Sequence, residues 1–499
     1  MEREAKLLVP PDYALPELDD LVDLVPGGTV RVFPDQRLEA TYYDTDDHRL
    51  AGWGTTLRWR LEDSDGRWTL KLPAAGSGAG QLVRSEVEVP GEPGAVPEPM
   101  QDLVRAYTRS SALRPVAHIV TVRRRQHLLS GAGELLIEID DDRVSVMRGE
   151  RVDLRFHEVE VEQRGEAPPK LLRAVVERIG GDGAIDDRGV PKVVRALGLE
   201  TLTAEVTVPV VDGGAAVGAA VQQAIAAGVD RLLRHDPGVR LGDDAEEVHQ
   251  ARVATRRLRS DLRTFRDALD PEWTARVRAG LKWIADALGA VRDADVLAAR
   301  LVRQIERLDE ADQGPGAALL GQLARERDEA RQALVEIMGE PRYLTLVEDL
   351  VRAAGAPPLA SGKLPGEWAA AVLPGLVAAR WRQLAKAVRG LGPAPDDAAL
   401  HQVRIRAKRA RYAAEAVAPV AGARARKLAA RLADLQTMLG ELNDAAVAQR
   451  WLRAHTGRAA QALVAGQLIQ VQRDEAARWR AAWPKAWSRA SKRRLRTWL

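Results

Sequence analysis

The chain has 499 residues, 46% of them hydrophobic, which is enough for about two to four domains with packed cores. Its formal net charge is only +3, so any binding of anions must come from local clusters of basic residues and not from the charge of the whole protein. It contains no cysteine, which excludes disulfide bonds, thiolate metal sites and a cysteine nucleophile.

Residues 1 to about 200 alternate polar and apolar positions over short segments bounded by Gly, Pro and Asp, a pattern typical of β-strands. We expect eight strands, near residues 2–9, 37–45, 54–62, 67–72, 82–89, 116–128, 134–146 and 151–163. Eight antiparallel strands can close into a barrel. Helices fit near residues 14–24, 98–108 and 168–179. Because Glu2 and Glu4 follow the initiator at once, we expect no signal peptide.

Charged residues recur at alternate positions of these strands, so that they share one face of each strand. The sets are Glu2, Glu4 and Lys6; Arg58 and Arg60; Thr69 and Lys71; Arg84, Glu86 and Glu88; Arg123 and Arg125; Glu138 and Asp140; and Glu158, Glu160 and Glu162. On a single strand this is the solvent face of an ordinary sheet. Over seven strands, with basic and acidic sets on separate strands, it favours a charged lumen. Such an interior can hold a polyanion between arginines and lysines on one wall and metal ions on carboxylates of the other.

Five motifs in order carry a resemblance to a known family. They are E-x-E-x-K at 2–6, YYDTDDHRL at 42–50, LRWR at 57–60, TLK at 69–71 and EVEVE at 158–162. In this, residues 1–205 resemble the CYTH domain of triphosphate tunnel metalloenzymes. The resemblance implies an eight-stranded antiparallel β tunnel, flanked by helices, that binds a triphosphate and a divalent metal, Mg²⁺ or Mn²⁺.

The resemblance also implies roles for individual residues. The metal-side carboxylates would be Glu2, Glu4, Glu158 and Glu160, with Glu162 as an alternative. The residues that hold phosphate oxygens would be Lys6, Arg58, Arg60, Lys71, Arg123, Arg125 and Lys192. Those closest to the chemistry would be Glu2, Glu4 and Lys6.

Residues 206–218 are rich in Pro, Gly and small residues, which indicates a linker to a helical half at 219–499. The apolar run 214–229 contains Gln222 and Gln223 and is too weak to span a bilayer. A second Gly/Pro-rich break, at 355–367, divides the helical half into repeats at about 219–354 and 367–499.

Basic residues are spaced three and four apart after residue 249, which draws one stripe along a helix beside the apolar face. The first stripe consists of His249, Arg252, Arg256, Arg259, Arg263 and Arg266, with Arg257 beside it. The second copy has His401, Arg404, Lys408, Arg409 and Arg411, which match His249, Arg252, Arg256, Arg257 and Arg259. The phrases LGAVRDADVL at 288–297 and LGELNDAAVA at 439–448 repeat at nearly the same distance from each histidine. The repeat predicts two bundles about a pseudo-twofold axis, with the stripes lining one groove.

Taken singly, such stripes are often solvated helix faces, and the histidines could be core residues. The acids of the repeated phrase, Asp293, Asp295 and Asp444, are either metal ligands or, as we favour, structural partners of the arginines. H-x-x-R-x-x-x-R-R-L-R at 249–259 resembles the signature of the CHAD domain, a conserved-histidine α-helical module. That resemblance implies binding of inorganic polyphosphate through the two stripes.

The leading hypothesis is a metal-dependent inorganic triphosphatase with a polyphosphate-binding module. One alternative is a scaffold that binds polyphosphate with little or no turnover. Another is a CYTH enzyme acting on ATP, as an adenylate cyclase, or on thiamine triphosphate. Nucleic acid is not an expected partner, because the stripes carry only Phe265 and Tyr412 as stacking groups. We expect a cytoplasmic protein without membrane contact, with polyphosphate granules as a candidate location.

Overall fold

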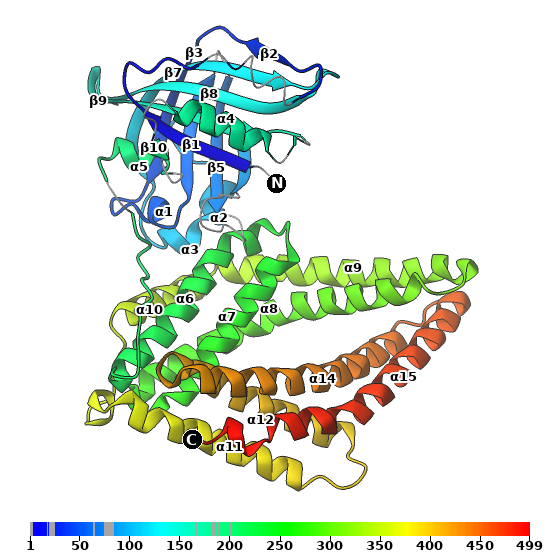
Figure 1. Ribbon diagram of the computed structural model, residues 1–499. Coiled ribbons are helices and arrows are strands. Elements are labelled where there is room, and N and C mark those ends of the chain that lie inside the picture. The colour runs from blue at the N-terminus through cyan, green and yellow to red at the C-terminus, as the bar shows by residue number, and fades with distance from the viewer. Residues whose placement is uncertain are drawn as a thin grey trace. The chain divides into compact units, whose positions relative to one another are not determined.

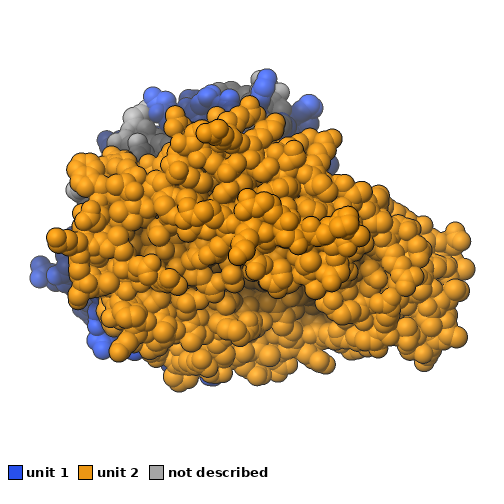
Figure 2. All heavy atoms as spheres, turned by 90° about the horizontal axis from the view of Figure 1, so that it is seen from below, with its two compact units in different colours: residues 1–205 blue, residues 206–499 orange. Residues whose placement is uncertain are grey.

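The structure is a computed structural model that describes residues 3–16, 18, 25–62, 65–73, 84–165, 167–168, 170–181, 185–186, 190–199 and 202–499. It divides into two compact units, Met1–Glu205 and Val206–Leu499, coloured separately in Figure 2. The first unit is a β-sheet with short helices, and the second is entirely helical (Figure 1).

The first unit is built on one antiparallel sheet in the order β10-β1-β9-β8-β7-β3-β4-β5-β6, with β2 paired to β7. Its strands are β1 (Arg3–Val9), β2 (Thr29–Val32), β3 (Gln36–Asp44), β4 (Thr56–Glu62), β5 (Asp65–Pro73), β6 (Arg84–Pro90), β7 (Arg114–Leu129), β8 (Leu135–Arg148), β9 (Arg151–Gln163) and β10 (Ile185–Asp186). All eight expected strands are present, with their ends within two residues of the expected positions. The short β2 and β10 were not expected, because four and two residues give too little alternation to detect.

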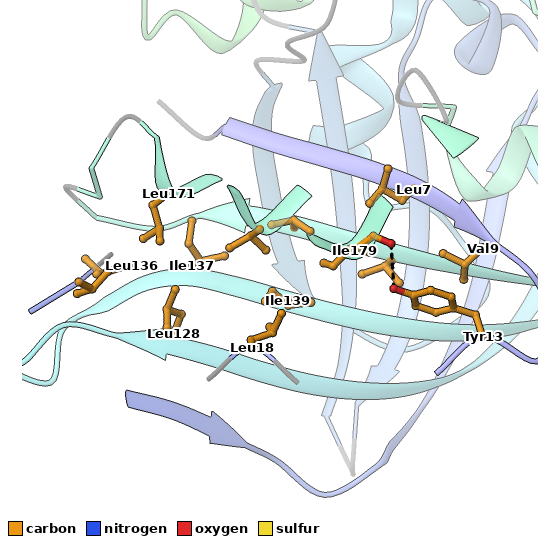
Figure 3. Close-up of a cluster of buried hydrophobic side chains, with 14 residues drawn as sticks. Leu7, Val9, Tyr13, Leu18, Leu128, Leu136, Ile137, Ile139, Leu171 and Ile179 are labelled. Atoms are coloured by element: carbon orange, nitrogen blue, oxygen red, sulfur yellow. Dashed lines mark hydrogen bonds between the residues drawn. The ribbon is translucent and has the colours of Figure 1, made fainter. Parts of the chain in front are cut away.

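The apolar residues of β1, β8 and β9 lie on the outer face of the sheet. Helix α4 (Leu171–Gly180) packs there and forms a core with these strands (Figure 3). The buried residues of this core include Leu7, Val9, Ile137, Ile139, Val159, Val161, Val175 and Ile179. Tyr13 joins the core and donates its hydroxyl to the Ile179 carbonyl at 3.0 Å. Since neighbours along a strand point to opposite faces, this packing turns the intervening charged residues inward.

The described part of the first unit contains four other short helices: α1 (Arg49–Gly52), α2 (Glu98–Leu103), α3 (Arg105–Thr108) and α5 (Lys192–Ala196). The helix expected near 98–108 is therefore two pieces, which meet at Val104. The helix expected near 14–24 falls mostly outside the described residues. The helix expected near 168–179 is α4, which begins three residues later than expected.

The second unit contains ten α-helices, and all of its residues are described. They are α6 (Val217–Leu241), α7 (Ala245–Thr264), α8 (Pro271–Ile305), α9 (Glu310–Gly339), α10 (Pro341–Gly355), α11 (Ala369–Arg389), α12 (Asp397–Ala416), α13 (Ala418–Ala421), α14 (Ala423–Ala454) and α15 (Ala459–Ala490). Helices α8 and α9 form one long hairpin and α14 and α15 another (Figure 1).

The internal repeat is visible as matched helices. The stripe helices α7 and α12 each have 20 residues, and each carries its histidine at the fifth position. Each begins at an aspartate whose side chain accepts from a backbone N–H of the first turn, Asp244 from Glu246 and Asp396 from Ala399. The duplicated sequence thus forms two similar bundles. Arg266, expected to continue the first stripe, lies beyond the end of α7 in a 3₁₀ turn.

Close packing of α6 against α7 predicts the effect of one substitution. A Cβ at Gly228 of α6 would lie 2.5 Å from a side-chain carbon of buried Leu258. Gly228→Ala should therefore lower the free energy of unfolding by about 1–3 kcal/mol. A Cβ at Gly466 of α15 would have no atom within 4 Å, so Gly466→Ala should raise stability by about 0.5–1 kcal/mol. Thermal or denaturant unfolding of both variants checks this, and equal effects would contradict it.

Candidate functional site: a charged tunnel and a basic groove

The curled sheet encloses a cavity of about 500 Å³. Its wall consists almost entirely of ionisable or hydroxyl side chains. The lining residues are Glu4, Lys6, Tyr42, Thr56, Arg58, Arg60, Lys71, Glu86, Glu88, Arg123, Arg125, Glu138, Asp140, Glu160, Glu162, Arg164, Pro191 and Lys192. The alternation seen in the sequence therefore does line an interior, and both signs of charge face it.

The basic side of the cavity is built on β4, β5 and β7. Arg58 and Arg60 project from β4, and Lys71 projects from β5, where it pairs in register with Thr56. Lys71 forms an ion pair with Glu86 at 3.1 Å. Arg58 donates to the hydroxyl of Tyr42 at 3.4 Å, and its buried Nε has no hydrogen-bond partner among the described residues. A guanidinium donor buried in this way can bind an anionic ligand.

The acidic side is built on β1, β8 and β9, whose registers bring carboxylates together in layers. Glu4 and Glu138 both lie opposite Glu162, and Asp140 lies opposite Glu160. Asp142 lies opposite Glu158 in the deepest layer, where both are fully buried. Carboxylates this close and this buried need cations beside them.

Two arginines of β7 supply part of the positive charge that these carboxylates need. Arg123 lies in register with Asp142 and forms ion pairs with Asp142 at 2.6 Å, with Glu160 at 3.3 Å and with Asp140. Arg125 lies in register with Asp140 and pairs with it at 2.8 Å. The expectation of a basic wall facing a separate acidic wall is therefore wrong at β7, because β7 and β8 are adjacent and their opposite charges neutralise each other.

Lys192 of α5 supplies further positive charge to the same carboxylates. Its ammonium lies 2.9 Å from Asp142, 2.7 Å from Glu158 and 2.8 Å from Glu160. Burial penalises the charged form of Lys192, but these three carboxylates outweigh the penalty and hold its pKa well above its ordinary value. Burial likewise opposes ionisation of Glu160, but Lys192, Lys6 and Arg123 hold its pKa well below the ordinary value.

The same three carboxylates can hold a metal ion. One oxygen from each of Asp142, Glu158 and Glu160 lies within 4.8 Å of the other two. Glu158 Oε2 is buried and has no hydrogen-bond partner among the described residues, and burial raises the pKa of this carboxyl group. An all-oxygen donor set of this kind fits Mg²⁺ or Mn²⁺. A bound ion would compete with the Lys192 ammonium for the same oxygens.

The structure places most of the expected tunnel residues on the cavity wall. Those that line it are Glu4, Lys6, Arg58, Arg60, Lys71, Arg123, Arg125, Glu160, Glu162 and Lys192. Glu158 lies behind the wall in contact with Lys192, and Glu2 is outside the described residues. Lys6 bridges Glu4 at 3.2 Å and Glu160.

Asp142 was missed by sequence reasoning. It continues the alternation of Glu138 and Asp140, but the run of three aspartates at 140–142 hides which face each one takes.

In the helical unit, the two basic stripes lie side by side. Burial, followed by the charges of Arg256, Arg404 and Arg252, lowers the pKa of Lys408 to about 7. Lys408 belongs to α12, whereas Arg252 and Arg256 belong to α7, so cations of both helices share one region. Arg256, Lys408 and Arg411 also surround the ring of Tyr412, at 5.6, 5.9 and 5.6 Å from its centre. We call this region, where the sequence predicts a shared groove, the basic groove.

Residues of the second repeated phrase, at 288–297 and 439–448, contact arginines of the basic groove. The guanidinium group of Arg252 packs over Gly289, and that of Arg404 packs over Gly440. A Cβ added at Gly289 would lie 3.9 Å from Arg252 Nε, and one added at Gly440 would lie 3.8 Å from Arg404 Nε. The two glycines are equivalent in the repeat, so the same packing occurs twice. Asp293 forms an ion pair with Arg252 at 2.8 Å, which agrees with a structural role for this acid.

The other stripe residues differ in their surroundings. Arg257 and Arg411 both bind Glu415, and Arg257 also contacts buried Asp261. Burial and the charges of Arg409, Arg278 and Arg380 lower the pKa of Arg263, so Arg263 and Arg409 belong to a second cluster of cations. Neither histidine is a core residue: His249 is half-buried, and exposed His401 contacts Asn443 at 3.1 Å.

Comparison with known proteins assigns both units. The CYTH domain family matches residues 1–181 and the CHAD domain family matches residues 223–453. An uncharacterized protein of Mycobacterium tuberculosis is 31% identical over 473 residues, which are 91% of this chain and 88% of that protein. The chain is a CYTH–CHAD protein.

Two solved structures are similar to parts of this CYTH–CHAD protein. PptA from Streptomyces chartreusis is 27% identical, with a TM-score of 0.46, over 55% of this chain and 100% of that one. The CHAD domain from the plant Ricinus communis is 25% identical, with a TM-score of 0.47, over 58% of this chain and 96% of that one.

Membership in these families indicates a triphosphate-tunnel type of hydrolase for the CYTH unit and polyphosphate binding for the CHAD unit. None of the described helices is long and apolar enough to cross a membrane.

The competition between Lys192 and a metal ion can be measured without enzyme activity. Lys192→Met leaves Asp142, Glu158 and Glu160 short of one buried cation, which should cost about 3–5 kcal/mol of stability at pH 7. Mg²⁺ should restore part of that loss, so it should raise the unfolding temperature of this variant more than that of the unmodified protein. Lys71→Met is the control, since it removes a lysine from the same cavity but away from the three acids. An equal Mg²⁺ effect in all three proteins would contradict a shared site.

Proposed function

We propose that the CYTH unit is a divalent-metal-dependent triphosphatase acting on inorganic tripolyphosphate, and that the CHAD unit binds longer polyphosphate. The observation that carries the proposal is the enclosed cavity itself. Its wall brings Lys6, Arg58, Arg60, Lys71 and Lys192 to one volume of about 500 Å³. A compact, highly charged ligand without an apolar part matches such a wall.

We assign different roles to the cations of the cavity. Arg123 and Arg125 are bound to aspartates of β8, so they chiefly order the acidic side. Arg58 and Arg60 are the candidates for the phosphate oxygens, together with Lys71 after it exchanges Glu86 for substrate. Preorganised guanidinium groups of this kind stabilise the negative charge of a phosphoryl transition state.

The metal, when bound, would neutralise the triphosphate and activate a water. The residues proposed to hold it are Glu4, Glu158 and Glu160, with Glu2 as the fourth of the expected set and Asp142 as an addition from the structure. Lys6 lies between Glu4 and Glu160, and burial of its ammonium is outweighed by these two acids, which raise its pKa. It therefore stays charged and can bind a phosphate oxygen beside the carboxylates.

The aromatic residues favour an inorganic substrate. Trp59 and Trp68 point away from the cavity: Trp59 donates to the Gly91 carbonyl and Trp68 is buried against Tyr43. Tyr42 is the aromatic residue on the described cavity wall. A purine or thiazole ring inside the tunnel would thus have only Tyr42, which is buried and bound by Arg58, to stack on among the described wall residues.

An organic triphosphate is the second candidate substrate, and one observation favours it. A hollow of about 660 Å³ next to the cavity is lined by Phe33, His127 and Arg125, and Arg125 also lines the cavity. Phe33 and His127 contact edge to face at 4.5 Å. A ring could lie there while the phosphates occupy the tunnel.

Phosphate release decides between these substrates. Tripolyphosphate, ATP and thiamine triphosphate should be tested with Mg²⁺ and with Mn²⁺, and tripolyphosphate is expected to react fastest. Arg58→Ala should lower kcat/KM about 100-fold, because it removes a donor for transition-state charge. Arg124→Ala is the control: it lies between two cavity arginines but is exposed and pairs with Asp35. Binding without phosphate release would support a scaffold, and equal loss in both variants would reject Arg58 as a tunnel contact.

In the CHAD unit, the polyphosphate ligand should supply the negative charge that the basic groove lacks. Lys408, with a pKa lowered to about 7, is largely deprotonated above neutral pH in the free protein. A bound polyanion favours the charged form, so it raises this pKa and binding takes up a proton.

Polyphosphate affinity should therefore fall between pH 7 and pH 9, and calorimetry in buffers of different ionisation enthalpy should show proton uptake at pH 8. Lys408→Arg keeps the charge but cannot release it, so it should abolish the uptake and flatten this pH dependence. Affinity should also fall steeply with salt, as counterions are released. Unchanged proton uptake in Lys408→Arg would show that another group titrates.

A further inference from the structure

The helical unit contains a cavity lined by residues of α8, α14 and α15. These three helices are labelled in Figure 1. The cavity has a volume of about 390 Å³ and is lined by Arg300, Arg303, Gln304, Arg307, Glu441, Glu475, Arg478, Trp479 and Ala482. None of these residues belongs to the two basic stripes. The lining differs from that of the tunnel, because it combines arginines and carboxylates with an indole.

The floor of this cavity is a prearranged polar network. Arg300 is 7% exposed and binds Gln472 at 2.6 Å, Glu441 at 2.9 Å and Glu475. Gln304, also 7% exposed, donates to Glu475 at 3.3 Å. Every group of the network has a partner, so its geometry is held before any ligand arrives.

The rim carries cations that the network does not use. Arg303 lies in the last turn of α8 and Arg307 just beyond its end; both are exposed and form no ion pair within residues 206–499, all of which are described. Arg478 lies across the cavity and, unlike these two, forms one long ion pair with the network, to Glu475 at 3.9 Å. Trp479, beside Arg478, is half-buried and offers an apolar wall.

The internal repeat shows that this cavity is a departure from the shared plan. Arg300 and Gln304 correspond to Trp451 and His455, at the same distances from Leu288 and Leu439. Glu475 corresponds to Glu326, at the same place in α15 as Glu326 has in α9. In the second copy Trp451 donates to Glu326 at 2.8 Å, His455 contacts it at 2.9 Å, and the two rings stack. The second copy thus carries aromatic rings at these positions, whereas the first copy carries a charged network beside a cavity.

We propose that this cavity binds a purine nucleotide. Arginines of the rim bind phosphate, and the face of Trp479 stacks with a flat ring. Glu441 uses Oε2 to bind Arg300, which leaves Oε1 to accept from an exocyclic amine or ring N–H of the base. A volume near 390 Å³ is in the range of small-ligand pockets. A linear polyphosphate fits less well, because it would meet two carboxylates and gain nothing from the indole.

The test uses the full chain and monophosphates, AMP and GMP, because these lack the triphosphate that the tunnel is proposed to recognise. Calorimetry should show one site, with binding of at least one of the two nucleotides about tenfold tighter than that of ribose 5-phosphate, which has no base. No binding of either nucleotide at millimolar concentration would overturn the proposal.

Substitutions then separate the two parts of the ligand. Trp479→Leu should weaken nucleotide binding about tenfold and leave ribose 5-phosphate unchanged, while Trp479→Phe should keep most of the affinity because it keeps an aromatic face. The double variant Arg303→Ala, Arg307→Ala should weaken both ligands. Arg473→Ala is the control, since it removes an exposed arginine of α15 that does not line the cavity.

Two outcomes would contradict the assignment. Equal affinity in the Leu and Phe variants would exclude stacking on Trp479. Displacement of the nucleotide from the unmodified protein by saturating long-chain polyphosphate would show that the nucleotide binds in the basic groove and not in this cavity. Retention of the nucleotide under polyphosphate supports a separate site.

Discussion

The tunnel depends on the packing of α4 against the outer face of β1, β8 and β9. That packing buries the odd-numbered residues Leu7, Ile139 and Val159 and so commits the even-numbered charges to the interior. Once inside, carboxylates such as Asp142 and Glu158 lose their solvation, and the fold is stable only if cations reach them. Arg123 of β7 and Lys192 of α5 do so. An apolar contact on one face of the sheet thus determines the electrostatics of the other.

The two units balance charge in opposite ways. In the CYTH unit, opposite charges lie in register on neighbouring strands, so the cavity is neutralised before a ligand arrives and must exchange partners to bind one. In the CHAD unit, Arg252, Arg256, Arg404 and Lys408 converge with few acids beside them, and the cost appears as the lowered pKa of Lys408. The first arrangement suits a site that selects a metal and a substrate together. The second suits a surface that is stabilised by any sufficiently long polyanion.

Duplication accounts for the groove and also marks where the helical unit has diverged. The glycines packed against Arg252 and Arg404 occupy equivalent positions in the two copies, and a Cβ at either would lie in ordinary contact with the guanidinium group above it. The equivalent positions Arg300 and Trp451 have different surroundings: Arg300 lines a cavity, whereas Trp451 donates to Glu326 and stacks on His455. Retained packing and lost symmetry therefore occur on the same pair of helices.

Much of this protein could be predicted from its sequence, because alternation and helical spacing are local properties. The strands, the inward face of Lys6, Arg58 and Glu160, the repeat and the two stripes all follow from residues a few positions apart. Strand neighbours do not, since they depend on which segments meet in the sheet. Only the tertiary structure placed Arg123 beside Asp142 instead of opposite it, brought Lys192 to the three acids, and took Glu158 behind the cavity wall. It also brought Arg300 of α8 to Glu475 of α15, which are 175 residues apart. The energy of a buried charge depends on its neighbours in space, and the sequence does not specify these until the chain has packed.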